Sequence, residues 1–451
     1  MYTDCEKSEK RVKGEECRKC FARYFLSRVS RITSFLAFLA FLLFSGLAHA
    51  AEGTLRLQDL IDEVRNSHEV LSSEAKATAS RYRIPQAESL PDPMFMFGYQ
   101  NEGWNKYTYG EMQGSQWMYS VSQMFPFPGK RPLRGEMAAQ ETQSLDAETD
   151  AATLRTIARV KELYYDLLFV YKSLDIIHDR TVLFSRIEDA ALARYSSGMA
   201  PQQEVIMAQT EKYMLLEKEE MLKQKVQSLE AMLNTTLGRD VKSPLGRPVE
   251  PSPTVYARSM DELINLAYLN SPEIRSRERM VAAAETRVKL AKKDFYPDFT
   301  IAGSVFKRTG EFEDMWSLTT TVNIPIFYRT KQKQAVHEAE ASLSGAQHEL
   351  DGAKSMLSSG IRDSFSMYTA AGKLMELYKS GLIPKAYQDF ELALSGYTTG
   401  KVEAITTISR LKTILDFETS YWGQFAEREK AIARLDALAG ITDFQPRGGK
   451  K

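Results

Sequence analysis

The feature that most constrains this chain is a long stretch without glycine or proline. Residues 136–197 form an uninterrupted run of 62 residues that contains neither. Side chains of one helical face recur in it at steps of three, four and seven: Leu154, Ile157, Tyr164, Leu168 and Tyr171. At 1.5 Å per residue such a helix would be roughly 90 Å long. The run therefore predicts a coiled-coil-like assembly, because helices of ordinary globular domains are far shorter.

The long run ends in a turn, and a second helix follows it. Gly198 and Pro201 close the run, and residues 202–237 form another stretch free of Gly and Pro. Glycine tolerates a positive φ angle, and proline cannot continue a helix. We therefore predict a helical hairpin with a long helix at about 132–197 and a second helix at 202–237.

The same order of segments occurs twice in the chain. The proline-rich segment VKSPLGRPVEPSP at 241–253 separates a first repeat, 51–240, from a second repeat, 254–441, which a tail at 442–451 follows. The matched segments are 57–77 with 260–280, 90–99 with 296–305, 122–131 with 321–330, and 193–209 with 395–411. An ordered series of matches indicates an internal duplication. Each repeat is predicted to contain a helix, two strands, a long helix and a further helix.

Two pairs of predicted strands alternate apolar and polar side chains. Their expected bounds are about 93–101, 115–125, 298–307 and 315–325, and the second repeat continues with helices at about 329–397 and 402–439. This alternation fits a soluble sandwich or a transmembrane barrel. Aromatic residues crowd the first hairpin, as in the girdles at two lipid–water interfaces: Tyr99, Trp104, Tyr107, Tyr109, Trp117, Tyr119, Phe125 and Phe127. Four strands cannot close a barrel around a pore, so several copies must combine.

The first fifty residues are predicted to be a secretory signal peptide. A basic stretch precedes the apolar run SFLAFLAFLLFSGLA, and Ala48-His49-Ala50 has the small-x-small pattern of a cleavage site. All three cysteines lie in this leader, together with nine Lys or Arg and five Asp or Glu. The rest of the chain then has 50 basic and 54 acidic side chains, a balance that does not suggest a nucleic-acid partner.

No pattern in the sequence indicates an enzyme, a cofactor or a metal centre. We find no Gly-rich phosphate loop, nucleophile motif or metal-ligand cluster, and the histidines at 68, 178, 337 and 348 lack ligand spacing. Five methionines lie in or near the first hairpin: Met94, Met96, Met112, Met118 and Met124. They are either ordinary packing residues or soft ligands suited to Cu(I) or Ag(I).

Taken together, these segments resemble the TolC-like family of outer membrane efflux channels. The resemblance covers about Leu55 to Ile441. It rests on the duplicated halves and on these motifs: PDP and YPD where strands begin, FPFPGKR and NIPIF where strands end, and two Tyr-x-x-Gly turns. SQMFPFPGKRPLRGEMA and GLIPKAYQDFELALSGYTTG are most similar to the branch that serves heavy-metal pumps of the resistance-nodulation-division (RND) type.

The resemblance implies a mainly α fold with a small β part, assembled as a homotrimer. Each chain would contribute four strands to one transmembrane β-barrel in the outer membrane and four helical segments to a long α-helical barrel in the periplasm. The hairpin tips would dock a periplasmic adaptor, or membrane fusion, protein and an inner-membrane RND-type pump. The resemblance therefore implies a passive duct for small toxic solutes, including heavy-metal cations.

The resemblance also assigns candidate residues to the two tips. The candidates for adaptor docking and gating are Tyr195, Gly198, Met199, Tyr397, Gly400 and Lys401. Plain hairpin turns with buried tyrosines are the structural alternative, because a glycine is needed there regardless of function. The pore-lining candidates are Glu204, Glu403, Thr406 and Ser409, and the alternative for the two glutamates is a solvated position on a helix face. Val402, Thr406 and Ser409 replace the arginine and two aspartates of the best-known gate, so that gate is not expected here.

Two other functions remain open at this point. With the same fold, the chain could be the outer membrane duct of a type I protein secretion system. A non-channel periplasmic coiled-coil scaffold would explain the helices but not the aromatic hairpins. Pro384 lies within the predicted long helix of the second repeat and is expected to bend it.

Overall fold

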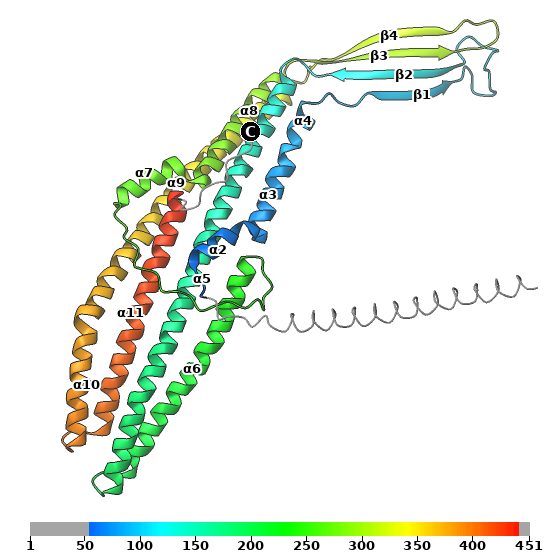
Figure 1. Cartoon of the computed structure of the whole chain (residues 1–451). Helices are drawn as coiled ribbons and strands as arrows, with labels where there is room; N and C mark the ends of the chain where they lie inside the picture. Colours follow the sequence, from blue (N-terminus) through cyan, green and yellow to red (C-terminus); the bar gives the residue numbers. More distant parts are fainter. Residues whose placement is uncertain (1–53, 442–451) are drawn as a thin grey trace, which may run out of the picture. The chain divides into compact units, whose positions relative to one another are not determined.

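A computed structural model describes residues 54–441 of the chain (Figure 1). Most of the described residues belong to one compact unit, Leu55–Ser243 with Arg247–Lys451, and this unit is described here by itself. Pro244–Gly246 fall outside this unit. The predicted signal peptide, with its three cysteines, and the predicted tail lie outside the described residues.

The elements of the first half follow one another in the predicted order. Short helices α2 (Leu57–Glu63), η1 (Val64–Asn66), α3 (His68–Arg81) and α4 (Arg83–Glu88) lead into the strands β1 (Met94–Gln100) and β2 (Gln116–Phe125). The long helix α5 (Lys130–Ser196) and the helix α6 (Gln202–Thr236) complete this half. The 67 residues of α5 form one helix without interruption, which the absence of Gly and Pro from most of it permits.

The second half repeats this order with one difference. It contains α7 (Met260–Asn270), α8 (Pro272–Lys293), β3 (Asp298–Lys307), β4 (Met315–Asn323) and α9 (Gln332–Glu376). A π-helical segment, η2 (Leu377–Leu382), then precedes α10 (Ile383–Thr398), and α11 (Ala404–Ala439) ends the half. The region expected as one helix at about 329–397 is therefore divided in two.

Pro384 gives the physical reason for this division. A proline lacks the N–H that would donate to the carbonyl of Ser380, and its ring clashes with that carbonyl in a regular α-helix. The wider π turn lies immediately before the proline, within Leu377–Leu382, where it changes the hydrogen-bond pattern. A bend is expected at Pro384 from the sequence, and the structure has this change of helix type beside it.

The strands form one antiparallel sheet in the order β1-β2-β3-β4. Each half contributes one hairpin, and the hairpins join where β2 pairs with β3, with Ser120 opposite Ser304. This mainly helical fold with a four-stranded sheet confirms the predicted fold class within one chain. Among the residues the structure describes, no helix combines the length and the apolar character needed to cross a membrane.

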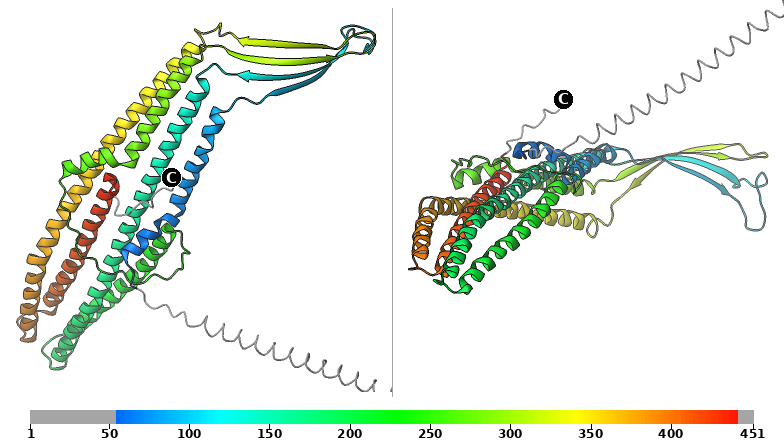
Figure 2. Two further views of the ribbon diagram at one scale, coloured as in Figure 1. Left: turned by 45° about the horizontal axis from the view of Figure 1, so that its top comes forward. Right: turned by 60° about the horizontal axis from the view of Figure 1, so that its bottom comes forward.

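Long helices lie side by side, with the sheet at one end and both helical turns at the other (Figures 1 and 2). The helix α5 contacts α6, α8 and α11, and α9 contacts α8 and α11. Near the turn end, buried Phe184, Ile187, Phe390, Ile408 and Leu411 belong to one apolar cluster from α5, α10 and α11. This cluster joins the two halves into one bundle, because burial of apolar surface is the main force that holds such helices together.

A buried lysine connects the two halves where the strands meet the helices. The exposed fraction of Lys130 is only 3%, and its Nζ donates to Asp298 Oδ1 at 2.9 Å and to the Tyr296 carbonyl at 3.0 Å. The Phe127 N–H donates to the same Asp298 oxygen at 2.7 Å. A buried charge is tolerated only when it is paired in this way. The pair therefore fixes the direction in which β2 and β3 leave the helices.

Candidate functional site

The two helical turns have the same backbone structure. Gly198 has a φ angle of +72° and Gly400 one of +76°, values that side chains with a Cβ rarely adopt. The Gly198 N–H donates to the Tyr195 carbonyl at 2.9 Å, and the Gly400 N–H donates to the Tyr397 carbonyl at 3.1 Å. The next residue donates back to the carbonyl five positions earlier at 2.8 Å in both turns, which completes a Schellman motif. The repeated Tyr-x-x-Gly is thus explained locally by a helix end that requires glycine.

The two tyrosines of the repeat have different environments. Tyr195 is 43% exposed, whereas Tyr397 is completely buried. Tyr397 packs in a small cluster with Ala191, Val205 and Ala404, which come from α5, α6 and the start of α11. The buried-tyrosine alternative therefore holds for Tyr397 and not for Tyr195.

Tyr397 is also the centre of a polar contact between the two hairpins. Arg194 of α5 donates from Nη1 to the Tyr397 carbonyl at 2.8 Å, and its guanidinium carbon lies 4.6 Å from the centre of the tyrosine ring. The Tyr397 hydroxyl donates to Glu204 Oε2 of α6 at 3.0 Å. Burial and the neighbouring Glu204 carboxylate raise the pKa of Tyr397 to about 12, so the hydroxyl remains a donor at neutral pH.

Arg194 was not among the residues that the sequence analysis selected. In the repeat it occupies the position of Gly396, where a Cβ would come within 2.5 Å of Val402 Cγ2. The second turn therefore has no space for the side chain that the first turn uses. This difference between aligned positions was visible in the sequence, but its meaning depends on the packing of one hairpin against the other.

The pore-lining candidates differ in burial and in side-chain contacts. Glu204 lies in the first turn of α6, half-buried, where the helix dipole favours a carboxylate. Glu403 precedes α11 without a side-chain capping bond and is exposed, as is Ser409, whereas Thr406 is half-buried. Within one chain, Glu204 is the candidate that the structure connects to a tip residue, through Tyr397.

The docking candidates at the ends of the turns are accessible in the single chain. The exposed fraction of Met199 is 71%, and Lys401 and both turn glycines are also exposed. An apolar and a cationic side chain thus occupy equivalent positions in the two Schellman motifs. Any partner that covers both tips would contact two chemically different surfaces.

A second cluster of the same three residue types lies farther along the hairpins. Arg180 of α5 donates to both carboxylate oxygens of Glu418 in α11, from Nε at 2.9 Å and from Nη2 at 2.6 Å. The Tyr387 hydroxyl of α10 donates to Glu418 Oε1 at 2.8 Å, and Arg180 Nη2 also contacts this hydroxyl. Arg180 and Glu418 are 14% and 16% exposed, so water screens their attraction little. No sequence pattern indicates this cluster, which holds α10 and α11 against α5 farther from the tips than the contact of Arg194 with Tyr397.

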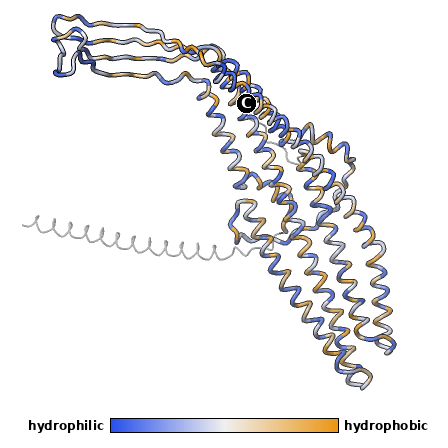
Figure 3. The backbone as a smooth tube through the Cα atoms, turned by 180° about the vertical axis from the view of Figure 1, so that it is seen from behind, coloured by the Kyte–Doolittle hydropathy of each residue, from blue (hydrophilic) through white to orange (hydrophobic). Residues whose placement is uncertain are grey.

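At the opposite end of the bundle, the sheet separates two kinds of side chain by face. Partners in the register show that one face carries Phe97 beside Tyr119, Val121 opposite Gly303, and Val305 opposite Trp316. The other face carries Ser120 opposite Ser304 and Ser304 opposite Ser317. The alternation of hydropathy along the strands is visible in Figure 3. One face of the sheet is therefore apolar, and the other is largely polar.

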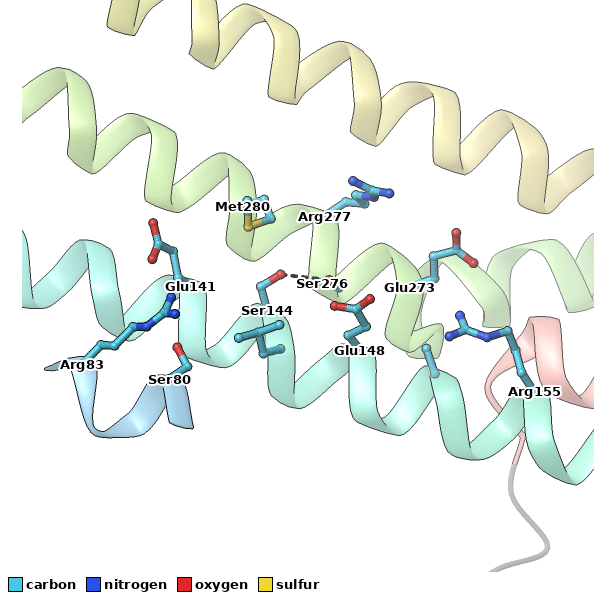
Figure 4. Close-up of a pocket in the computed structure, with 12 residues that line it drawn as sticks. Ser80, Arg83, Glu141, Ser144, Glu148, Arg155, Glu273, Ser276, Arg277 and Met280 are labelled. Atoms are coloured by element: carbon cyan, nitrogen blue, oxygen red, sulfur yellow. Dashed lines mark hydrogen bonds between the residues drawn. The ribbon is translucent and has the colours of Figure 1, made fainter. Parts of the chain in front are cut away.

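A groove of about 390 Å³ lies between α3, α4, α5 and α8 (Figure 4). Its lining includes three glutamates and three arginines: Glu141, Glu148, Glu273, Arg83, Arg155 and Arg277. Ser144 of α5 and Ser276 of α8 face each other, with their hydroxyl oxygens 2.9 Å apart. The formal charges of the six ionisable residues cancel, so the groove has no excess of either sign. Among the described residues, no group of three or more His, Cys, Asp or Glu is arranged to hold a metal ion.

Comparisons with known proteins agree with this geometry. A family model described as "Outer membrane efflux protein" matches residues 263–440. The cobalt-zinc-cadmium resistance protein CzcC of Cupriavidus metallidurans is 22% identical over 399 residues, which cover 86% of this chain and 91% of CzcC. The solved structure of the outer membrane protein VceC from Vibrio cholerae matches with a TM-score of 0.72 at 17% identity, covering 85% of this chain and 96% of VceC. A structure of CusC matches with a TM-score of 0.74 at 13% identity, covering 85% and 92%.

Proposed function

We propose that this chain, a member of the outer membrane efflux protein family, is the passive outer membrane duct of a tripartite efflux system. The family model over residues 263–440 and the fold shared with solved outer membrane channels support a channel and not an enzyme. They also disfavour the coiled-coil scaffold as an alternative.

The observation that carries the proposal is the two-faced sheet with open edges. β1 and β4 are the outer strands, and each has a partner on one side only within the chain. Trp316 and Leu318 on β4 are 79% and 70% exposed. Unpaired strand edges and exposed apolar side chains are both costly unless they are covered. Pairing β4 of one copy with β1 of the next would close a barrel with its apolar face toward lipid and its polar face inside.

Head-to-tail pairing of this kind makes a closed ring when the rotation between copies closes. Three copies would supply twelve strands, four from each chain. The same rotation would place three copies of both helical hairpins in a ring at the other end. We propose that these hairpins form the periplasmic tunnel and that their tips meet a periplasmic adaptor and an inner-membrane RND-type pump.

The tip residues receive their roles within this proposal. Exposed Tyr195, Met199 and Lys401 would contact the adaptor, and Gly198 and Gly400 would shape the tips. Glu204 would set the charge at the tunnel entrance, with Tyr397 and Arg194 limiting how far the two hairpins can separate. Glu403, Thr406 and Ser409 remain predicted pore-lining residues, whose position depends on the neighbouring copies.

Heavy-metal cations are the cargo that we favour. The support is the similarity to CzcC along most of both chains, since that protein is a cobalt-zinc-cadmium resistance protein. The channel itself has no energy source, so the pump would supply both the driving force and most of the selectivity. A protein-secretion duct would share the fold, and the genes that neighbour this one would separate the two possibilities.

The proposal is tested by fractionation and by growth. The full-length protein should be found in the outer membrane as a detergent-resistant trimer, and a deletion strain should lose tolerance to one or more of zinc, cobalt, cadmium, copper and silver. A monomer in the soluble periplasmic fraction would overturn the channel. Unchanged metal tolerance, together with loss of secretion of one protein, would overturn the proposed cargo.

A further inference from the structure

Four methionines of the first β-hairpin lie on the same face of the sheet. Met94 pairs with Ser122, Met96 pairs with Ser120, and Gly98 pairs with Met118. Met124 lies two residues beyond Ser122 on β2. Because side chains separated by two residues share a face, the order along the hairpin is Met124, Met94, Met96, Met118. Successive members are about 6.6 Å apart along the strand direction, at 3.3 Å per residue.

The structure supports this placement through side-chain positions. The terminal methyl carbon of Met118 lies 3.6 Å from the place where a Cβ of Gly98 would be, so Met118 covers the position on β1 that follows Met96. Met94 and Met96 are 63% and 52% exposed, and Met118 and Met124 are half-buried. We call these four residues the methionine ladder.

The ladder occupies the polar face and not the apolar one. Between its members, the partners on this face are Ser120 and Ser122. The apolar face of the same two strands, within their described bounds, carries aromatic and aliphatic residues, with one glutamine: Phe95, Phe97, Tyr99, Trp117, Tyr119, Val121, Gln123 and Phe125. Methionines that only filled apolar surface would be expected on that second face. Their position among serines argues for a role in contact with water or solutes.

The second hairpin provides an internal comparison. At the positions that match Met94, Met96, Met118 and Met124 in the repeat, it carries Thr300, Ala302, Ser317 and Asn323, and Met315 begins β4. Arg308 donates to the Met315 sulfur, so a cation would be repelled there. The four ladder methionines thus belong to one hairpin, and Met315 is not counted with them.

Thioether sulfur is a soft, uncharged ligand that favours Cu(I) and other soft cations over hard ones. Neighbouring ladder sulfurs on flexible side chains could approach one ion from two sides. Transport through a channel requires several weak sites in sequence, because a tight site would retain the ion. Four thioethers on a line satisfy this requirement better than one cage of carboxylates would.

We propose that the methionine ladder is a series of weak contact sites for soft monovalent cations, Cu(I) and Ag(I), on the inner wall of the barrel. The inference rests on the proposed function, because this face becomes an inner wall only when copies close the sheet. It adds a cargo class that the similarity to CzcC does not supply.

The test uses the exported protein, purified in detergent from the outer membrane without the cysteine-containing leader, with Ag(I) alone as the probe. The ladder variant carries Met94→Leu, Met96→Leu, Met118→Leu and Met124→Leu, which preserve volume and apolar character. The matched control carries Met→Leu at four exposed helix positions: Met214, Met221, Met232 and Met356. Equilibrium dialysis measures affinity, and X-ray absorption at the silver edge reports whether sulfur is bound.

Wild type and control should bind Ag(I) through sulfur, and the ladder variant should bind at least about tenfold more weakly. Equal binding by the ladder variant and wild type, or absence of silver–sulfur contacts in wild type, would overturn the inference. If wild type is trimeric in the outer membrane and supports zinc tolerance but shows no silver–sulfur contact, only this inference fails. If it does not form a trimer, the proposed function and the inference both fail.

Discussion

The two helical hairpins have nearly the same turn and opposite side-chain arrangements. Both end in a Schellman motif at a glycine with positive φ. The first hairpin contributes Arg194 and Glu204, and the second contributes the buried Tyr397 that lies between them. The halves of this duplicated chain have therefore become complementary. The second half provides the tyrosine side chain, and the first half provides the charged groups that contact it.

The long helices show a second difference of the same kind. α5 is continuous over 67 residues, whereas its counterpart is divided into α9, a π segment and α10. The Arg180–Glu418–Tyr387 cluster begins three residues after Pro384 and connects the divided helix to the continuous one. A rigid helix thus lies beside an interrupted one, with polar clusters at two levels between them.

The largest expected effect is a change of either turn glycine to proline. Gly198→Pro or Gly400→Pro would force φ to about −65° and remove the N–H that closes the turn. Export, measured as metal tolerance of cells, should be abolished, while trimers still insert in the outer membrane because the strands are untouched. Gly345→Ala is the control, since a Cβ there meets no atom within 4 Å. Normal export by a trimeric proline variant would refute the role of the tips.

Substitution of the two repeat tyrosines should give very unequal results. Tyr397→Ala would empty a fully buried site and leave Glu204 without its donor, at a cost of about 3–5 kcal/mol. Tyr195→Ala removes a side chain that is 43% exposed and should change the free energy of unfolding by about 0.5 kcal/mol or less. Thermal unfolding of the purified protein measures both. Equal losses would contradict the asymmetry of the tips.

The cluster above the tips should contribute less than Tyr397. Arg180→Ala leaves the Glu418 carboxylate with the Tyr387 hydroxyl as its remaining partner in the cluster, and we expect a loss of about 2–3 kcal/mol. Arg275→Ala is the matched control, because its pair with Asp150 is 51% and 61% exposed and should contribute less than about 1 kcal/mol. Denaturant unfolding compares the two variants, and a similar small loss in both would show that the Arg180 pair is no stronger than a surface pair.

The smallest expected effect concerns Pro384. Pro384→Ala would restore an N–H that can donate to the Ser380 carbonyl, so the π segment should become more regular. Hydrogen exchange of the amides of residues 377–383 should slow, with a gain in stability of at most about 1 kcal/mol. Unchanged exchange would mean that packing, and not the proline, maintains the π turn.

Much of the fold could be predicted because its signals are local. Freedom from Gly and Pro over 136–197 indicates most of the 67-residue helix, and alternation indicates strands at nearly the observed bounds. The positions of both turns follow from Gly198 and Gly400, since positive φ is a property of single residues. The π segment was only partly foreseen, because Pro384 predicts a disturbance but not its form.

The candidate site was predicted less completely, because its contacts join residues far apart in the chain. Arg194 contacts Tyr397 across 203 positions, and Arg180 contacts Glu418 across 238. No periodicity within one helix reports which face of another helix lies against it. Both arginines were therefore missed, and Tyr195 and Tyr397 were treated as equivalent.

The sequence by itself determined the elements of this protein, their duplication and the places where the chain turns, because steric preferences of single residues and short periods decide them. The tertiary structure alone decided which tyrosine is buried, which arginine holds it and which methionines share a face. The methionines depend on strand register, where a shift by one residue exchanges the two faces of the sheet. The tyrosine and the arginine depend on which faces of the helices pack together. Two copies of one local pattern thus acquired different environments.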